Sequence, residues 1–341
     1  MRPGTKRNNG PVRYSAETLI KGAAREAGFS DAGIADIKPS PESDRAYDRW
    51  IQQGKHGEMR YLSGGADKRH DPGLLLPGAR SVVSVALNYY SEARAERNET
   101  QIEEGKGVFS LYAHGRDYHS VLTEMLTEFD GRLRRFFPGM ESAICVDTQP
   151  ISERDLAVRA GIAWLGKNTM AISPEFGSWV FLGELVTNLE LRSDAPLRSL
   201  CGSCTRCMDA CPTGALDEAY TLDATKCISY LTIEKRGDIP REFHRAISGN
   251  LFGCDDCQRA CPFNDYPSDS NVFTGEPPNR LVGMSLRELS EVGDEDFREL
   301  TRDSAIGRCK AAGLRRNARI VARNLGDTGA KRGAAGDQGP T

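Results

Sequence analysis

The chain has 341 residues, of which 39% are hydrophobic and 27% are charged, and its formal net charge is −3. This length allows two or three domains with packed cores. The net charge argues against indiscriminate nucleic-acid binding but permits a local basic face. No stretch approaches the ~20 apolar residues that span a bilayer. The opening residues contain no apolar signal segment, so we expect a cytoplasmic protein without a membrane anchor.

Several helices are predicted in the first half of the chain. Residues 1–14 are polar and predict a disordered lead-in. Residues 15–27 have apolar residues at helical spacing, with Ser15 as a cap, and residues 118–137 predict a longer amphipathic helix. A further helix is expected to run from Thr148 to about residue 160.

Strands are predicted where apolar and β-branched residues cluster. The three segments are 81–90, 142–147 and 179–188. Residues 91–107 are rich in Glu and Arg without apolar periodicity, so they predict a solvated loop. Strands that alternate with helices indicate an α/β layer domain over residues 15–195.

Eight cysteines lie between positions 201 and 261. The first run, over 201–212, reads C-x2-C-x2-C-x3-C-P, the spacing of bacterial ferredoxins that carry [4Fe-4S] clusters. The second run, over 254–262, has the same rhythm without its leading cysteine, and Cys227 supplies the missing thiolate. In two-cluster ferredoxins the cysteine beside the proline binds the other cluster. The predicted sets are therefore Cys201, Cys204, Cys207 and Cys261 for one cluster, and Cys211, Cys227, Cys254 and Cys257 for the other.

Two other roles for these cysteines are less favoured. Paired C-x2-C units can hold zinc, but zinc has no use for the two C-x3-C-P endings. Disulfides would need an oxidising compartment. Cys145 and Cys309 fall outside both sets and are expected to be buried thiols. We therefore predict a ferredoxin-like domain over 196–266, followed by a helical segment over 267–325 and a flexible tail over 326–341.

Iron–sulfur clusters transfer electrons, but composition does not indicate which residues of the chain hold the group that receives them. The sequence contains neither a G-x-G-x-x-G fingerprint nor a P-loop. The fragment Asp117-Tyr118-His119 is the closest approach to the D-x-H-x-x-G signature of His-on cobalamin binding, but Leu122 stands where the glycine belongs.

Several motifs together resemble one family, epoxyqueuosine reductase. They are LLLPGARSVV at 74–83, YAHGRDYH at 112–119, VDTQP at 146–150, GKNTM at 166–170, SPEFG at 173–177, GEL at 183–185, CISYLTIE at 227–234 and both cysteine runs. The resemblance covers residues 15–325. It implies an α/β (α+β) cobalamin-binding domain related to those of reductive dehalogenases, a ferredoxin-like domain with two [4Fe-4S] clusters, and a short helical segment. The implied reaction reduces epoxyqueuosine to queuosine in tRNA.

The resemblance also suggests site residues. Asp147 matches the proposed catalytic acid, and we expect an apolar corrin face to raise its pKa enough for donation at neutral pH. The alternative is that Asp147 only caps the helix after Pro150. The expected cofactor contacts are Ser110, Lys167, Asn168 and Ser229. For Lys167 and Asn168, the competing interpretation is a solvated turn.

A basic stretch near the C-terminus is the expected RNA surface. The predicted contacts are Arg315, Arg316 and Arg319, with Lys235 and Arg236 beside the clusters. The alternative is an ordinary helix end or solvent-exposed face, because these are often equally rich in basic residues. The expected partners are tRNA carrying epoxyqueuosine and an external low-potential electron donor of the ferredoxin or flavodoxin type, and we expect a monomer.

Two alternative functions use parts of the same pattern. A reductive dehalogenase shares both cofactors, but its usual twin-arginine export signal is missing and a basic face would serve no purpose there. A ferredoxin-type electron-transfer protein would need the clusters alone, and would leave almost 200 preceding residues without a role. Retention of cobalamin separates this last alternative from the two enzymes.

Overall fold

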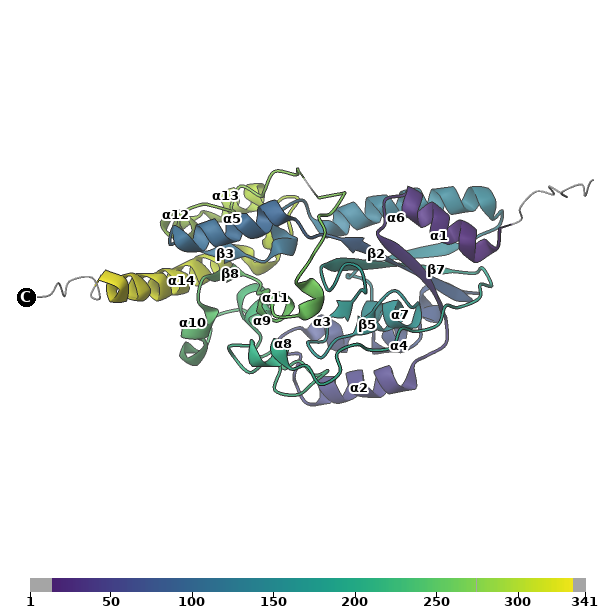
Figure 1. Ribbon diagram of the computed structural model, residues 1–341, viewed down its shortest axis with the longest axis horizontal. Coiled ribbons are helices and arrows are strands. Elements are labelled where there is room, and N and C mark those ends of the chain that lie inside the picture. The colour runs from purple at the N-terminus through teal and green to yellow at the C-terminus, as the bar shows by residue number, and fades with distance from the viewer. Residues whose placement is uncertain (1–13, 274, 334–341) are drawn as a thin grey trace, which may run out of the picture.

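The computed structural model describes residues 14–273 and 275–333 (Figure 1). The strands are β1 (Asp31–Asp36), β2 (Ser81–Asn88), β3 (Val108–Phe109), β4 (Ser142–Cys145), β5 (Trp164–Leu165), β6 (Ala171–Ile172), β7 (Val180–Thr187) and β8 (Asn250–Phe252). The α-helices are α1 (Ala16–Glu26), α2 (Pro41–Gln52), α3 (Arg60–Ser63), α4 (Ala66–His70), α5 (Glu92–Glu103), α6 (Tyr118–Phe136), α7 (Glu153–Arg159), α8 (Arg206–Asp209), α9 (Ile228–Ile233), α10 (Arg241–Ile247), α11 (Asp256–Arg259), α12 (Leu286–Glu291), α13 (Asp294–Leu300) and α14 (Lys310–Gly333).

A four-stranded sheet organises the first half of the chain. Its strand order is β1-β2-β7-β4, and every neighbouring pair is antiparallel. All residues of β2 are buried because helices cover both faces of the sheet. Val83 and Leu87 pack in the cluster that contains residues of α1 and α6, whereas Val82 and Ala86 pack beside α7. Figure 1 shows α1 and α6 on one side of the sheet and α7 on the other. This period of two is the alternation that strand geometry imposes.

Most elements expected from the sequence are present. The helices over 15–27 and 118–137 are confirmed as α1 and α6, and the three predicted strands are β2, β4 and β7. The helix expected from Thr148 begins only at Glu153. Strand β1 was not expected, although it is a full edge strand. Strand direction was also not predicted, since apolar spacing does not report whether neighbours run parallel or antiparallel.

The prediction of a loop over 91–107 is wrong, because α5 occupies most of it. This helix buries polar side chains, so its inward face carries no apolar signal. Arg94 forms an ion pair with Glu276 at 3.1 Å, and the Asn98 side-chain amide donates to the Phe109 carbonyl at 2.8 Å. Burial of these groups is tolerated because each has a partner.

The two cysteine runs fold into the same local structure. Each run turns into a four-residue helix, α8 or α11, that is preceded by Thr205 or Asp255 with nearly the same backbone angles. The amide of Cys211 donates to Met208, and the amide of Cys261 donates to Gln258, in matching positions. The repeated spacing therefore encodes a repeated ligand loop. Strand β3 pairs in parallel with β8 and joins the sheet domain to the second run.

The C-terminal helices pack against the cysteine-rich segment. Leu314, Ala318 and Val321 recur at helical spacing on α14 and are buried with α12 and α13 residues. The prediction of helical structure beyond Pro267 is confirmed. Helix α14 continues to Gly333, beyond the expected boundary at 325. Residues 334–341, and all of the expected lead-in 1–14 except Tyr14, lie outside the described residues. Within the described ranges, no helix combines the length and the apolar character needed to cross a bilayer.

Candidate functional site

Four thiols of the first predicted set surround one cavity. The cavity measures about 160 Å³, and its walls include Cys201, Cys204 and Cys207 of the first run and Cys261 of the second. Burial, together with the charges of Cys201 and Cys204, raises the pKa of the Cys207 thiol. Chain folding thus brings the distant Cys261 to the other three, as cluster ligation would require. In the part of the chain that is described, no three His, Cys, Asp or Glu side chains are grouped to hold a single metal ion.

Three thiols of the second predicted set, Cys227, Cys254 and Cys257, have pKa values that are raised mainly by burial. Burial is the largest cause that raises the pKa of the Cys257 thiol, and the charges of Cys227 and Cys211 add to it. Burial, together with the charges of Asp256 and Cys227, also raises the pKa of the Cys254 thiol. The charge of Cys207 also raises the pKa of Cys257, so the two sets lie close to each other. Ser229 follows Cys227 at the start of α9 and hydrogen-bonds to its thiol.

Lys167 and Asn168 contact the two cysteine runs. The Lys167 ammonium donates to the carbonyl oxygens of Gly202 and Cys204 at 2.7 and 3.0 Å. The Asn168 amide donates to the Cys257 carbonyl at 3.4 Å. Both side chains therefore fasten the loop after β5 to the two cysteine loops, and a solvated turn does not describe this segment.

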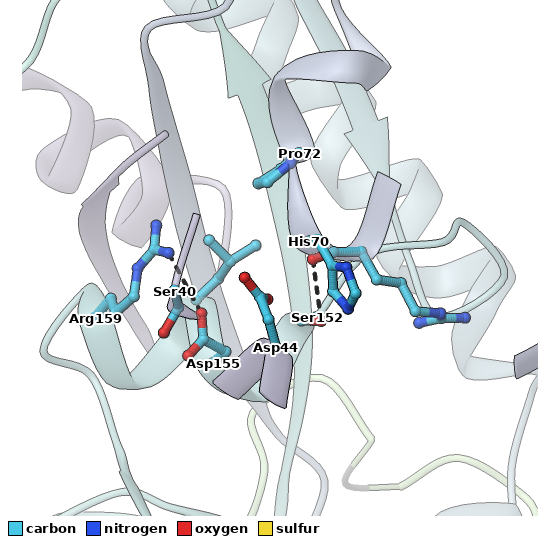
Figure 2. Close-up of a pocket in the computed structure, with 9 residues that line it drawn as sticks. Ser40, Asp44, His70, Pro72, Ser152, Asp155 and Arg159 are labelled. Atoms are coloured by element: carbon cyan, nitrogen blue, oxygen red, sulfur yellow. Dashed lines mark hydrogen bonds and ion pairs between the residues drawn. The ribbon is translucent and has the colours of Figure 1, made fainter. Parts of the chain in front are cut away.

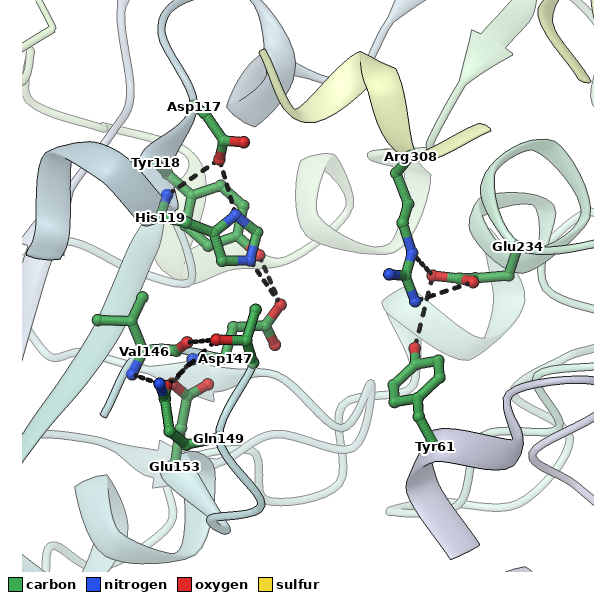
Figure 3. A network of polar contacts seen from close by, with 11 residues as sticks. Tyr61, Asp117, Tyr118, His119, Val146, Asp147, Gln149, Glu153, Glu234 and Arg308 are labelled. Atoms are coloured by element: carbon green, nitrogen blue, oxygen red, sulfur yellow. Dashed lines mark hydrogen bonds and ion pairs between the residues drawn. The ribbon is translucent and has the colours of Figure 1, made fainter. Parts of the chain in front are cut away.

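Asp147 follows β4 in a turn with positive φ (45°). Its carboxylate accepts hydrogen bonds from the Tyr118 hydroxyl at 2.9 Å and from His119 Nε2 at 3.0 Å (Figure 3). Its backbone N–H donates to Glu153 at 2.6 Å. The carboxylate is thus directed at α6, and capping of α7, which begins after Ser152 without a side-chain cap, is not its role.

The expected rise in the pKa of Asp147 is wrong for this structure. Burial by itself would raise the pKa, but the hydrogen bonds from His119 and Tyr118 outweigh it and hold the pKa below its usual range. The sequence expectation failed because it considered an apolar surface and not these two donors, which come from another element.

His119 bridges two carboxylates. Its Nδ1 lies 2.7 Å from Asp117 and its Nε2 lies 3.0 Å from Asp147. Burial would lower the pKa of the imidazole, but hydrogen bonds to Asp117 and Asp147 outweigh it and raise the pKa to about 9. On the far side of Asp147, burial and the charge of Asp147 raise the pKa of Glu153 to about 7.

A second polar cluster faces Asp147. Figure 3 shows Tyr61 and Arg308 on the opposite side from His119 and Asp147. Arg308 forms a bidentate ion pair with Glu234 at 2.7 and 3.3 Å, and its guanidinium lies 5.0 Å from the centre of the Tyr61 ring. The charge of Arg308 helps to lower the pKa of Asp147. Tyr61 is about half exposed. Sequence analysis did not assign Tyr61, His119 or Arg308 to this site, although His119 lies in the quoted YAHGRDYH motif and Arg308 in the basic C-terminal stretch.

A separate small cavity lies beside α7 (Figure 2). It measures about 10 Å³, which is near the space that one water requires. Asp44, Asp155 and Arg159 line it, and burial is the main cause that raises the pKa of both carboxyls. The cavity is too small for a substrate.

Comparison with known proteins identifies the family. The sequence matches the family model "Epoxyqueuosine reductase QueG, DUF1730" over residues 69–148 and the model "4Fe-4S double cluster binding domain" over 200–264. It is 38% identical to the epoxyqueuosine reductase of Leadbetterella byssophila over 308 residues, which are 90% of this chain and 98% of that protein. The chain belongs to the epoxyqueuosine reductase family.

Solved structures of epoxyqueuosine reductases have the same fold. One, in complex with a tRNA-Tyr stem loop modified with epoxyqueuosine, matches with a TM-score of 0.78 and 33% identity, over 93% of this chain and 84% of that one. Another, from Bacillus subtilis, has its aspartate-bearing catalytic loop swung out of the active site. It matches with a TM-score of 0.78 and 32% identity, over 94% of this chain and 85% of that one.

Ser110 connects the sheet domain of this epoxyqueuosine reductase family member to its second cysteine run. The buried hydroxyl donates to Asp255, which also accepts from the Leu111 N–H at 2.9 Å. Gly253 approaches so closely that a Cβ there would lie 2.5 Å from the Ser110 Cβ. The hydroxyl is therefore engaged with the cluster loop.

Most of the predicted RNA contacts bind the protein itself. Arg316 donates to the carbonyl oxygens of Lys235, Gly237 and Leu231 at 2.6–2.9 Å. Arg315 forms an ion pair with Asp294 at 2.7 Å, Lys235 pairs with Glu58, and Arg236 donates to carbonyls at 233, 308 and 309. Arg319 is exposed and donates to Ser290 at 3.2 Å. The basic pattern thus includes interior contacts that sequence alone did not distinguish from a surface.

We expect replacement of Arg316 by alanine to change the free energy of unfolding more than replacement of Arg319 does. Arg316→Ala should lower the free energy of unfolding by about 1–3 kcal/mol, because three backbone carbonyls, one of them on the buried Leu231, lose a charged donor. Arg319→Ala should stay within about 0.5 kcal/mol of wild type. Urea unfolding measures both free energies.

If Arg319 contacts a phosphate, its replacement should reduce the slope of log K against log salt concentration for tRNA binding by about one. An unchanged slope would place the RNA surface elsewhere.

Proposed function

We propose that this chain reduces epoxyqueuosine to queuosine in tRNA. The reaction converts an epoxide to an alkene: it takes up two electrons and two protons, and the oxygen leaves as water. The observation that carries the proposal is that Asp147 and the second cysteine set lie on two sides of one aromatic cluster. Tyr118, which donates a hydrogen bond to Asp147, has its ring centroid 6.0 Å from that of the partly buried Tyr112, and the Tyr112 ring lies 6.0 Å from Phe252, two residues before Cys254. A proton donor and an electron source thus converge on one region.

The eight thiols hold two [4Fe-4S] clusters in the sets described above. We place the first set on the outside because Leu200, which lines its cavity beside Cys201, has an exposed side chain. The second set is nearer to Ser110 and Tyr112. When bound, the clusters would supply a path for electrons from an external low-potential donor of the ferredoxin or flavodoxin type, with the first set holding the outer cluster and the second set the inner one.

Cobalamin is the second cofactor, and when bound it supplies the low-valent cobalt centre at which the epoxide carbon gains electrons. The residues around its site fit a polar macrocycle held next to the inner cluster. Ser229 is partly exposed beside Cys227, while Ser110, Lys167 and Asn168 order the cysteine loops. Ser229 and Asp147 would contact the cofactor directly, whereas Ser110, Lys167 and Asn168 would act by holding the cysteine loops in place.

Asp147 is the acid that protonates the departing oxygen. Its carboxylate is about half exposed and faces the gap toward Tyr61 and Arg308, where a modified nucleoside can approach. Tyr61 offers a face for stacking of a base, and Arg308 supplies positive charge for a phosphate. The tRNA carries epoxyqueuosine at the anticodon wobble position, and a monomer in the cytoplasm is sufficient for this reaction.

An assay with epoxyqueuosine-containing tRNA tests the proposal. Anaerobically reconstituted protein, cobalamin and a chemical reductant should convert the modified nucleoside to a product that lacks one oxygen atom. Mass spectrometry of digested tRNA measures the product. Protein loaded with both clusters and cobalamin that leaves the nucleoside unchanged would contradict the proposed function.

A further inference from the structure

The sequence Asp117-Tyr118-His119 builds a hydrogen-bonded chain that ends at the proposed acid. Asp117 caps α6 by accepting from the His119 N–H at 3.0 Å, and the same carboxylate oxygen lies 2.7 Å from His119 Nδ1. The other ring nitrogen, Nε2, lies 3.0 Å from Asp147. The imidazole is therefore held at both nitrogens by carboxylates from two different elements.

This geometry defines the protonation of the ring. A neutral imidazole has one N–H and can donate to one acceptor only. An ionised carboxylate only accepts, so two ionised carboxylates at the two nitrogens require the imidazolium form. The charged groups that surround His119 are Asp117, Asp147, Glu153 and, across the gap, Arg308. The Tyr118 ring stacks on the imidazole at 4.0 Å between centroids, and its hydroxyl donates a hydrogen bond to Asp147.

The two carboxylates differ in what else they do. Asp117 is committed to the start of α6, and its side chain is 28% exposed. Asp147 is 55% exposed and faces the gap where substrate is proposed to bind. Of the two carboxylates that contact His119, Asp147 is therefore the one that can pass a proton toward the substrate.

We propose that His119 stores the proton that Asp147 delivers, with Asp117 as the residue that positions the imidazole. This inference rests on the proposed function. The proton moves from His119 Nε2 to the Asp147 carboxylate, and from there to the oxygen that leaves the substrate. The imidazole becomes neutral and is reprotonated from water, since its side chain is 30% exposed. Repetition of this transfer delivers both protons of the water that is released.

Glu153 has a different role in this arrangement. It contacts the backbone N–H of Asp147 and not the carboxylate. It therefore holds the turn with positive φ in place, and it is not in line to pass a proton to the substrate oxygen.

The first test is the titration of His119, measured by NMR of histidine nitrogens without any turnover. We expect a pKa of about 9 in the wild-type protein and a clear decrease in Asp147→Asn, because one of the two carboxylates is lost. A pKa near the ordinary value of about 6.5 that does not respond to Asp147→Asn would overturn the inference. This result is independent of the proposed function.

The second test is the pH dependence of single-turnover reduction. The wild-type rate should fall as pH rises through about 9, because His119 then loses its proton. His119→Gln should remove this alkaline limb and lower the rate by about 10²–10⁴-fold, with unchanged tRNA affinity. His119→Ala should recover part of the rate when imidazole is added. His70→Gln is the matched control, since His70 also pairs with an aspartate (3.2 Å) and has 27% exposure.

The outcomes separate the two proposals. A rate and an alkaline limb in His119→Gln within about twofold of wild type would overturn the role of His119 while the proposed function stands. Wild-type protein that shows the expected titration but no reduction would overturn the proposed function and the delivery step with it.

Discussion

Asp147→Asn should lower the turnover of epoxyqueuosine tRNA by about 10²–10⁴-fold, the usual contribution of a positioned proton donor. The side-chain amide has almost the same shape, and its oxygen can still accept from Tyr118 and His119. It cannot transfer a proton at neutral pH. Single-turnover rates under fixed reductant measure the effect, together with cobalamin content and tRNA affinity.

The controls for Asp147→Asn are a measurement of stability and a matched substitution at another half-exposed aspartate. The carboxylate of Asp147 is about half exposed, so Asp147→Asn should change the free energy of unfolding by at most about 1 kcal/mol. Asp36→Asn is the matched variant, because Asp36 is also half exposed and pairs with Arg159 at 3.3 Å. Asp36→Asn should keep the wild-type rate. Full activity of Asp147→Asn would remove Asp147 from the mechanism.

Iron content tests the two cysteine sets. Reconstituted wild-type protein should contain about eight irons per chain, as expected for two [4Fe-4S] clusters. Cys257→Ala should reduce this to about four and abolish turnover, because the inner cluster loses a ligand and electrons no longer reach the site. Iron analysis and the electron paramagnetic resonance signal of the reduced protein measure the change.

Cys309→Ala is the control for that substitution. Cys309 is buried and its thiol lies 3.3 Å from the Ile306 carbonyl, outside both sets. Its replacement should leave the iron content unchanged. Wild-type protein with about four irons, or with zinc in place of iron, would contradict the assignment of ligands to two clusters.

Local information in the sequence predicted the parts of the fold that depend on short spacing. The apolar residues of β2 predict a buried strand, and the structure places them between two helical layers. Helix α5 was missed, because its buried face is polar and is satisfied by Glu276 and Phe109, which lie elsewhere in the chain. Hydropathy cannot report a buried face whose partners are distant.

The candidate site divides in the same way. Cysteine spacing by itself determined the expected cluster ligands, because three thiols within seven residues set the geometry of a ligand loop whatever the rest of the chain does. Only the tertiary structure decided the partners of Asp147 and Arg316. The Asp147 carboxylate accepts a hydrogen bond from His119, which lowers the pKa of Asp147. The Arg316 side chain donates to backbone carbonyls of the same chain. Protonation and exposure depend on groups that folding brings together from distant positions, and these are not encoded in any one segment.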